Sequence, residues 1–325
     1  MKRLLTFGAT WALFVGGLSA TQNYIVRTTA TETLLRTSCA TLGCSVVYGL
    51  GDPSGQVFLM TIPDLANAGS VLAALTSMAG VTNYEGDGVI SLQQGSPPIP
   101  AALYNTNLVS YFGTNVRYGY AFQPAALLIR LAETQSTFNV SGTGLVAVID
   151  TGVDPDHPVL RNVLVTGYDF TRSGGGSGSE MFDVNQSTTA VVDGSPPLFV
   201  NKNTAALLDP LTAAVVGSPN HAAFGHGTMV AGIIHLVAPK APIMPLKAFK
   251  SDGSGNLSDV LRAIYQAVRS NARVINMSFS TPQVSLELKR ALDHATISRA
   301  NCVASAGNDG ISALFYPAAY DNLIG

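Results

Sequence analysis

The spacing of apolar residues along the chain changes near residue 93, and a different kind of unit is predicted on each side. Before it, four strands are predicted at residues 24–27, 45–50, 56–62 and 89–92. Two helices are predicted between them, one over residues 31–41 and one where apolar residues recur at helical spacing, at Val71, Leu72, Leu75 and Met78. The resulting order is βαββαβ, which is typical of a ferredoxin-like α+β unit.

After residue 100, strand and helix signals alternate, which favours a parallel sheet covered by helices on both faces. The predicted strands are residues 145–149, 243–248, 274–277 and 303–306. Ser258 is predicted to cap one helix, and residues 283–299 are predicted to form another. The fold class of this part is therefore predicted to be α/β.

Proline, glycine and serine mark the segments between these units. Residues 93–117 are predicted to be a linker and processing region, because their first part, 93–100, has several prolines and no apolar periodicity. The second domain is predicted over residues 118–325. Within it, residues 171–224 are rich in glycine, serine and other polar residues, and they are predicted to be a surface insertion.

The N-terminus has the pattern of a secretory signal peptide. Lys2 and Arg3 precede an uncharged apolar stretch, residues 4–18, and small residues follow it. This stretch is shorter than the roughly 20 residues that a bilayer helix needs, which disfavours a membrane anchor. Residues 1–20 are therefore predicted to be removed on export, and the protein is predicted to be secreted, without a membrane partner after cleavage.

Composition excludes one class of partner and leaves one pairing open. Charged residues make up 12% of the chain, the net charge is −2, and lysine and arginine are scattered, so no nucleic-acid partner is predicted. Three cysteines are too few for a disulfide framework. Cys39 and Cys44 are close enough to pair across a short turn, which the sequence alone does not decide, and Cys302 is predicted to be a buried small hydrophobe.

Two residues predict general-base chemistry. Asp150 follows directly on the apolar run 145–149, so it is predicted at the carboxyl end of a buried strand, where α/β sheets carry functional groups. His226 begins a segment with helical apolar spacing, and the positive end of the helix dipole there disfavours the imidazolium form. A buried carboxylate on the far ring nitrogen would select the tautomer and stabilise the charged ring when it forms.

A third polar residue, Asn308, follows the predicted strand 303–306, and its amide can donate to a developing oxyanion. Each residue alone has a simpler explanation, because an Asp can cap a turn, one His can be packed, and Asn-Asp-Gly forms ordinary turns. Small residues such as Gly227 and Gly232 favour the functional interpretation, since they let a helix pass close to neighbouring backbone.

These residues belong to four short segments that occur in one order along the chain. The segments are Asp150-Thr151-Gly152, His226-Gly227-Thr228 with Val230-Ala231-Gly232, Asn276-Met277-Ser278 and Ser305-Ala306-Gly307-Asn308. Together they resemble the signatures of the subtilisin-like serine proteases. The resemblance implies polypeptide substrates, with Asp150 orienting the base, His226 acting as the base and Asn308 donating to the oxyanion. It implies no required cofactor and no metal among these residues, and structural calcium is not readable from the sequence.

The same resemblance implies how a substrate peptide binds. The extended segment of Ser278, Phe279 and Ser280 would pair with the substrate as an added strand. The residues Ala304, Ser305, Ala306 and Gly307 would form the facing wall of the pocket for the residue before the cleaved bond. Ser280 stands where the family usually has glycine.

Residues 21–92 resemble the family's propeptide, including Tyr84-Glu85-Gly86-Asp87 near its end. This implies a folding chaperone and temporary inhibitor of a zymogen. The family's nucleophile lies on a Gly-Thr-Ser segment, which this sequence does not contain; Thr76-Ser77-Met78-Ala79 lacks the glycine and precedes Asp150. The chain as given is therefore predicted to be inactive, and residues 21–325 alone are predicted not to fold well and not to cleave casein.

Three alternatives compete with a fragment of an active protease. A non-catalytic pseudoprotease, acting as a binding or inhibitory module, is compatible with the missing serine. A metal hydrolase is disfavoured, because His221 and His226 are five residues apart and no His-Glu-x-x-His motif is present. A dinucleotide site at Gly142-Thr143-Gly144 is disfavoured, because those glycines precede the strand rather than follow it.

Overall fold

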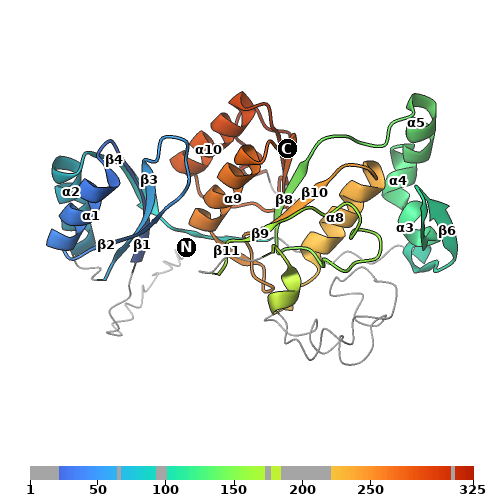
Figure 1. Ribbon diagram of the computed structural model, residues 1–325, viewed down its shortest axis with the longest axis horizontal. Helices are drawn as coiled ribbons and strands as arrows, with labels where there is room; N and C mark the ends of the chain where they lie inside the picture. Colours follow the sequence, from blue (N-terminus) through green and yellow to red (C-terminus); the bar gives the residue numbers. More distant parts are fainter. Residues whose placement is uncertain (1–21, 64–66, 93–100, 173–176, 184–220, 309–311) are drawn as a thin grey trace, which may run out of the picture. The chain divides into compact units, whose positions relative to one another are not determined.

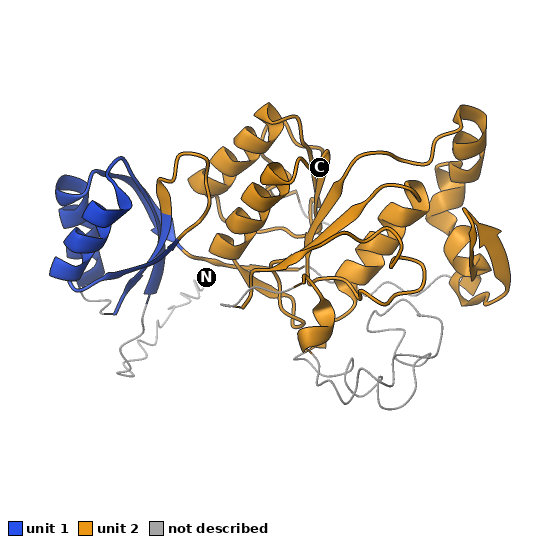
Figure 2. Ribbon diagram, in the orientation of Figure 1, with its two compact units in different colours: residues 1–48, 58–86 blue, residues 49–57, 87–325 orange. Residues whose placement is uncertain are grey.

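The computed structural model describes residues 22–63, 67–92, 101–172, 177–183, 221–308 and 312–325 (Figure 1). These form two compact units, one of residues 22–48 and 58–86 and one of residues 49–57 and 87–325 (Figure 2). The predicted signal peptide, residues 93–100 of the predicted linker and most of the predicted 171–224 insertion lie outside the described residues. No helix among the described residues is both long and apolar enough to cross a membrane.

The first unit has the element order that the apolar pattern predicts. Its elements are β1 (Gln22–Thr28), α1 (Glu32–Thr41), β2 (Ser45–Gly49), β3 (Val57–Ile62), α2 (Ala68–Met78) and β4 (Val81–Gly86), and the sheet order is β2-β3-β1-β4. The prediction for the last strand was wrong, because β4 rather than residues 89–92 closes this sheet. The sequence obscures β4, since only one of its faces is covered and only Val81 of its residues is buried.

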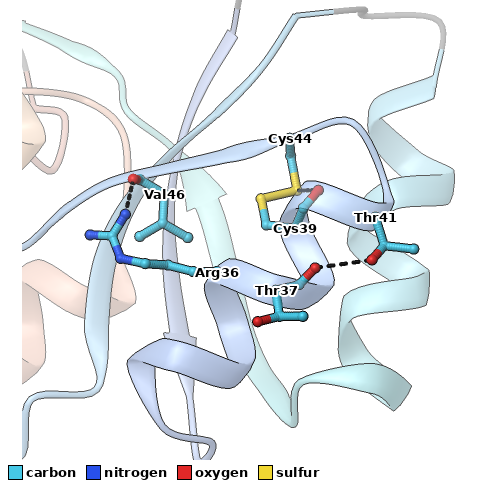
Figure 3. Close-up of a disulfide and its surroundings, with 6 residues drawn as sticks. All are labelled: Arg36, Thr37, Cys39, Thr41, Cys44 and Val46. Atoms are coloured by element: carbon cyan, nitrogen blue, oxygen red, sulfur yellow. Dashed lines mark hydrogen bonds between the residues drawn. A yellow bond between two sulfur atoms is a disulfide. The ribbon is translucent and has the colours of Figure 1, made fainter.

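The structure contains the disulfide that the sequence left undecided. Cys39, near the end of α1, is bonded to Cys44, just before β2 (Figure 3). Arg36 of the same helix donates from Nη1 to the carbonyl oxygen of Val46 at 2.6 Å. The disulfide and this hydrogen bond both join α1 to the start of β2.

The second unit is built on the predicted parallel sheet. Its strands lie in the order β13 (Asn301–Ala304), β12 (Val274–Met277), β8 (Val146–Asp150), β10 (Ile243–Lys247) and β9 (Tyr168–Asp169), and every neighbouring pair is parallel. Figure 1 shows α8 (His226–Val237) on one face, and α9 (Leu257–Arg269) and α10 (Leu286–Ile297) on the other. The α/β prediction is confirmed, and the carboxyl ends of β8, β10, β12 and β13 lie along one edge.

Several boundaries differ from the sequence prediction. Asn256 rather than Ser258 is the N-cap of α9, so Ser258 lies inside the first turn. The last strand is shifted to residues 301–304, because its pairing with β12 begins at Asn301 opposite Val274. Before α10, Ser285 caps the helix by accepting from the amide of Leu288.

Residues 101–117, the described part of the predicted linker and processing region, have secondary structure of their own. They contain η2 (Ala101–Tyr104) and a hairpin of β6 (Leu108–Tyr111) and β7 (Thr114–Arg117). Phe112 and Gly113 both have positive φ, which suits the two-residue turn of such a hairpin. The short helices α3 (Tyr118–Ala121), α4 (Pro124–Leu128) and α5 (Leu131–Phe138) follow.

The described part of residues 171–224 is not all on the surface. Glu180, in the one-turn helix η3 (Glu180–Asp183), is 2% exposed, and Phe224 is 4% exposed. The prediction of a surface insertion was wrong for these residues, because a polar sequence does not reveal that its polar groups find buried partners.

Candidate active site

Asp150 is the last residue of β8, and its side chain is fully buried. Its Oδ1 accepts from the amide of Thr151 at 2.7 Å and lies 2.7 Å from Nδ1 of His226. Because an ionised carboxylate only accepts, the proton in this contact belongs to Nδ1. The remaining nitrogen, Nε2, is thereby left as the acceptor that a general base needs.

His226 is the first residue of α8, and Gly225 before it has a φ of +82° as the N-cap. Burial on its own lowers the pKa of His226, but the Asp150 charge, the hydrogen bond from Asp150 and the Glu180 carboxyl raise it, and the pKa ends above its ordinary value. The effect of Asp150 and Glu180 thus exceeds that of burial, and it acts against the helix dipole that the sequence indicates. The arrangement stabilises the imidazolium once a proton has been taken.

Close packing of two backbones brings the pair together. A Cβ added at Gly227 would lie 2.0 Å from the carbonyl oxygen of Gly152 and 3.2 Å from the Cβ of Asp150. The amide of Gly227 also donates to Oγ1 of Thr151 at 3.0 Å. Only glycine lets the first turn of α8 approach β8 this closely, as the small residues in the sequence indicate.

The other predicted site residues follow strands that end at the same edge. Asn308 comes four residues after β13, its side chain is exposed, and Gly307 before it has a φ of +95°. Ser305 donates its amide to the carbonyl oxygen of Met277 at 3.1 Å, which joins the ends of β13 and β12. The oxyanion role of Asn308, and the pocket role of Ala304, Ser305, Ala306 and Gly307, remain predictions.

The predicted peptide-binding segment is only partly available to a ligand. The side chain of Phe279 is fully buried, and its ring lies 5.0 Å from that of Phe249, so it belongs to the core and only its backbone can meet a peptide. Ser280 is 3% exposed and forms an antiparallel bridge with Ser91. Ser278 is half-buried and accepts from the side-chain amide of Asn276 at 2.9 Å.

A segment of the chain itself lies in extended form next to Ser280. The strand β5 (Val89–Ser91) pairs antiparallel with β11 (Ser254–Asn256), and the amide of Leu92 donates to the carbonyl oxygen of Gly253 at 2.9 Å. With Ser91 bridged to Ser280, residues 89–92 form the middle strand between the two segments. Ile90 and Leu92 are 3% and 7% exposed, whereas Val89 is 64% exposed.

The start of this extended segment is anchored by Asp87. Its two carboxylate oxygens accept from the amide and the hydroxyl of Ser258, each at 2.8 Å. Burial raises the pKa of Asp87, although both hydrogen bonds from Ser258 act in the opposite direction. Asp87 therefore satisfies a free amide in the first turn of α9.

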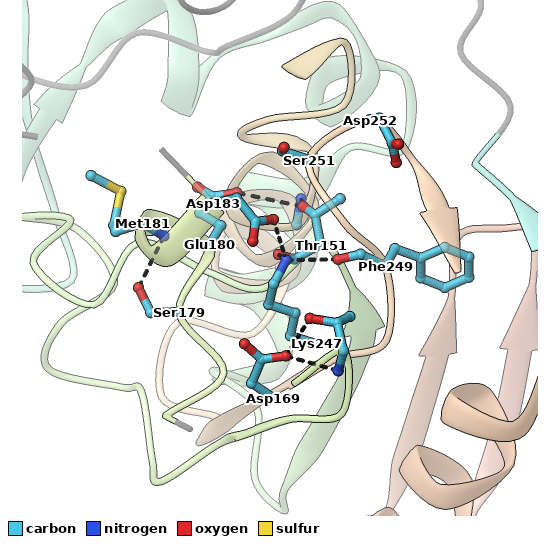
Figure 4. A network of polar contacts seen from close by, with 12 residues as sticks. Thr151, Asp169, Ser179, Glu180, Met181, Asp183, Lys247, Phe249, Ser251 and Asp252 are labelled. Atoms are coloured by element: carbon cyan, nitrogen blue, oxygen red, sulfur yellow. Dashed lines mark hydrogen bonds and ion pairs between the residues drawn. The ribbon is translucent and has the colours of Figure 1, made fainter. Parts of the chain in front are cut away.

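A buried polar network around Lys247, which the sequence did not reveal, includes Thr151, the residue after Asp150 (Figure 4). Lys247 is fully buried and donates to the carbonyl oxygens of Thr151 and Phe249, each at 2.7 Å, and to Oδ2 of Asp183 at 2.6 Å. A lysine inside the apolar run 243–248 is a usable signal, because an unpaired buried ammonium is costly. Glu180 gave no such signal, since it lies among polar residues.

The described residues contain no group of three or more His, Cys, Asp or Glu side chains that could hold a metal ion. His221, which the metal alternative invoked, has its Nδ1 2.8 Å from the hydroxyl of Ser251. The site is thus a carboxylate–imidazole pair at the carboxyl edge of a parallel sheet.

Comparison with known proteins identifies the family of this chain. Residues 142–325 match the family described as the subtilase family. The chain belongs to it. It is 33% identical over 179 residues to the thermophilic serine proteinase of Bacillus sp. (strain AK1), and this alignment covers 55% of this chain and 36% of that protein. It is 30% identical over 194 residues to the major intracellular serine protease of Bacillus subtilis (strain 168), which covers 55% of this chain and 49% of that one.

Solved subtilase structures show the same fold. The chain superimposes on fervidolysin from Fervidobacterium pennivorans with a TM-score of 0.55 and 21% identity, over 93% of this chain and 42% of that one. The epidermin leader peptide processing serine protease of Staphylococcus aureus gives a TM-score of 0.59 and 17% identity, over 94% of this chain and 68% of that one. The chain spans less than half the length of the curated relatives named above.

Proposed function

We propose that this chain carries the general base and the orienting carboxylate of a secreted serine endopeptidase of the subtilisin type. The observation that carries the proposal is the 2.7 Å contact between Asp150 Oδ1 and His226 Nδ1 at the carboxyl edge of the sheet. In the reaction, Nε2 of His226 takes the proton from a serine hydroxyl as it attacks the peptide carbonyl, and later returns it to the leaving amine. Asp150 keeps the tautomer and stabilises the imidazolium, and Asn308 donates to the oxyanion.

In this proposal, the catalytic serine lies in a longer polypeptide of which this sequence is a part. No Gly-Thr-Ser segment occurs among the 325 residues, and we expect them to be inactive by themselves. The signal-like residues 1–20 support export, although one relative is named an intracellular serine protease.

We also propose that residues 21–92 act as a temporary inhibitor of this site. The supporting observation is that residues 89–92 pair with β11 on one side and with Ser280 on the other, the binding mode of an added strand. While this strand is in place, a substrate peptide cannot pair with the same backbone. Cleavage and release of the segment would open the site.

The test begins with the longest reading frame that contains this sequence. Its product, compared with a His226→Ala variant and with residues 1–325 alone, is assayed on casein. We expect hydrolysis by the long product only, blocked by a phosphonofluoridate and unaffected by a chelator. Activity of residues 1–325, loss of activity to the chelator, or a frame that ends at codon 325 would contradict the proposal; the last outcome favours a non-catalytic binding module.

A further inference from the structure

Glu180 lies where three backbone segments meet. A Cβ added at Gly152 would be 2.7 Å from the amide nitrogen of Glu180 and 2.7 Å from the carbonyl oxygen of Gly178. Val153 donates its amide to the same Gly178 oxygen at 3.0 Å. The turn that carries Glu180 is thus packed directly against the two residues that follow Asp150 and Thr151.

The side chain of Glu180 is 2% exposed and reaches the first turn of α8. Its Oε2 accepts from the amide of Gly225 at 2.9 Å, and its Oε1 accepts from Oγ1 of Thr228 at 2.5 Å. These residues flank His226 on both sides. One carboxyl group therefore satisfies a free amide at the helix start and a buried hydroxyl one turn further on.

A third contact extends this carboxyl group to the other half of the pair. Oγ1 of Thr151 donates to Oε2 of Glu180 at 3.5 Å, while it accepts from the amide of Gly227 at 3.0 Å. Thr151 is the neighbour of Asp150 in the chain. The carboxyl of Glu180 thereby links the segment that bears Asp150 to the helical turn that bears His226.

The one-turn helix that carries Glu180 is itself fixed by ion pairs. Asp183, at the end of η3, accepts from Nζ of Lys247 at 2.6 Å (Figure 4) and also from Nη2 of Arg172 at 2.7 Å. Lys247 lies opposite Asp150 in the register of β10 and β8. The position of Glu180 is therefore determined from both of its ends, by the sheet and by α8.

We propose that Glu180 is a positioning residue for the catalytic pair, which holds the first turn of α8 against the end of β8 so that His226 Nδ1 stays bonded to Asp150. This inference rests on the proposed function only for the expected change in kcat, which requires an active enzyme. It goes beyond that function, because it assigns a role to a residue that touches neither the substrate nor the reacting atoms.

Burial raises the pKa of Glu180 to about 8, against the hydrogen bond from Thr228, which lowers it. A glutamine at this position has nearly the same shape and keeps one oxygen acceptor for the amide of Gly225, so Glu180→Gln is the conservative variant. Glu180→Ala removes every contact of the carboxyl, and Glu180→Asp withdraws it by one methylene.

The decisive readout is the low-field proton resonance of His226 Nδ1–H, recorded on the long product and assigned by its loss in His226→Ala. We expect wild type and Glu180→Gln to keep the resonance, and Glu180→Ala and Glu180→Asp to lose it while the circular dichroism remains native. Glu287→Ala is the matched control, since Glu287 is a fully buried glutamate in the first turn of α10, paired with Arg290. It should lower the melting temperature and keep the resonance.

If Glu180→Ala does not fold, the comparison of Glu180→Asp with Glu180→Gln tests the positioning role. A resonance kept in the aspartate variant, or lost in the glutamine variant, would overturn the proposal. In the long product, Glu180→Asp should lower kcat by about 10²-fold with KM nearly unchanged. A long product without any activity would refute the proposed function, and the resonance would still test the role of Glu180.

Discussion

The side chain of Ile90 gives a quantitative test of how residues 89–92 are held. It is 3% exposed, whereas the neighbouring Val89 on the same strand is 64% exposed. Ile90→Ala removes three buried carbon atoms, each worth about 0.8 kcal/mol, so attachment of the strand should weaken by about 2.4 kcal/mol. At tenfold for every ~1.4 kcal/mol, this corresponds to about 50-fold more frequent detachment.

Amide hydrogen exchange of the long product, kept inactive and therefore uncleaved by His226→Ala, measures this detachment. The amides of Leu92 and Leu257 donate to the carbonyl oxygens of Gly253 and Gly88, so both are protected only while the segment is in place. In Ile90→Ala, exchange at these two amides should be about 50-fold faster, with the amides of β8 unchanged. The matched control, Val89→Ala, should change the exchange by less than about threefold, because little apolar surface is lost.

Equal effects of the two substitutions would refute the reasoning, since they would show that burial of Ile90 does not hold the strand. The same conclusion would follow if Ile90→Ala left the exchange of Leu92 unchanged. Faster exchange throughout β8 would indicate global unfolding, and in that case the segment would not be a separately attached strand.

Three further predictions follow from the site and the core. Asp150→Asn should lower the pKa of His226, because the effect of burial remains while the carboxylate that raises it is lost; NMR titration of the imidazole would show this, and a raised pKa would contradict it. In the long product the same change should reduce kcat by about 10⁴-fold. Lys247→Met should lower the free energy of unfolding by about 3–5 kcal/mol in urea titrations, because buried acceptors lose their charged donor, and an unchanged midpoint would argue against this. Reduction of the bond between Cys39 and Cys44 should destabilise the first unit by about 2 kcal/mol, as the loop it closes is short, and unfolding curves that coincide with and without reductant would exclude that effect.

The sequence located Asp150 and His226 because both carry local signals. An apolar run that ends in a carboxylate marks the edge of a buried strand, and a histidine before Gly227 and an apolar periodic segment marks the start of a packed helix. The strand at residues 89–92 was recognised, but it was assigned to the wrong sheet. Strand pairing depends on partners far away in the chain, and here the partner is β11, more than 160 residues later.

By itself, the sequence determined the parallel α/β architecture, the βαββαβ order of the first unit and the two residues that form the carboxylate–imidazole pair, since hydrophobic period and strand ends are local properties. Only the tertiary structure decided that Glu180 and Lys247 are buried and bonded to residues next to that pair. A charged residue in a polar segment looks solvated, and whether it is buried depends on donors and acceptors that folding brings from distant parts of the chain.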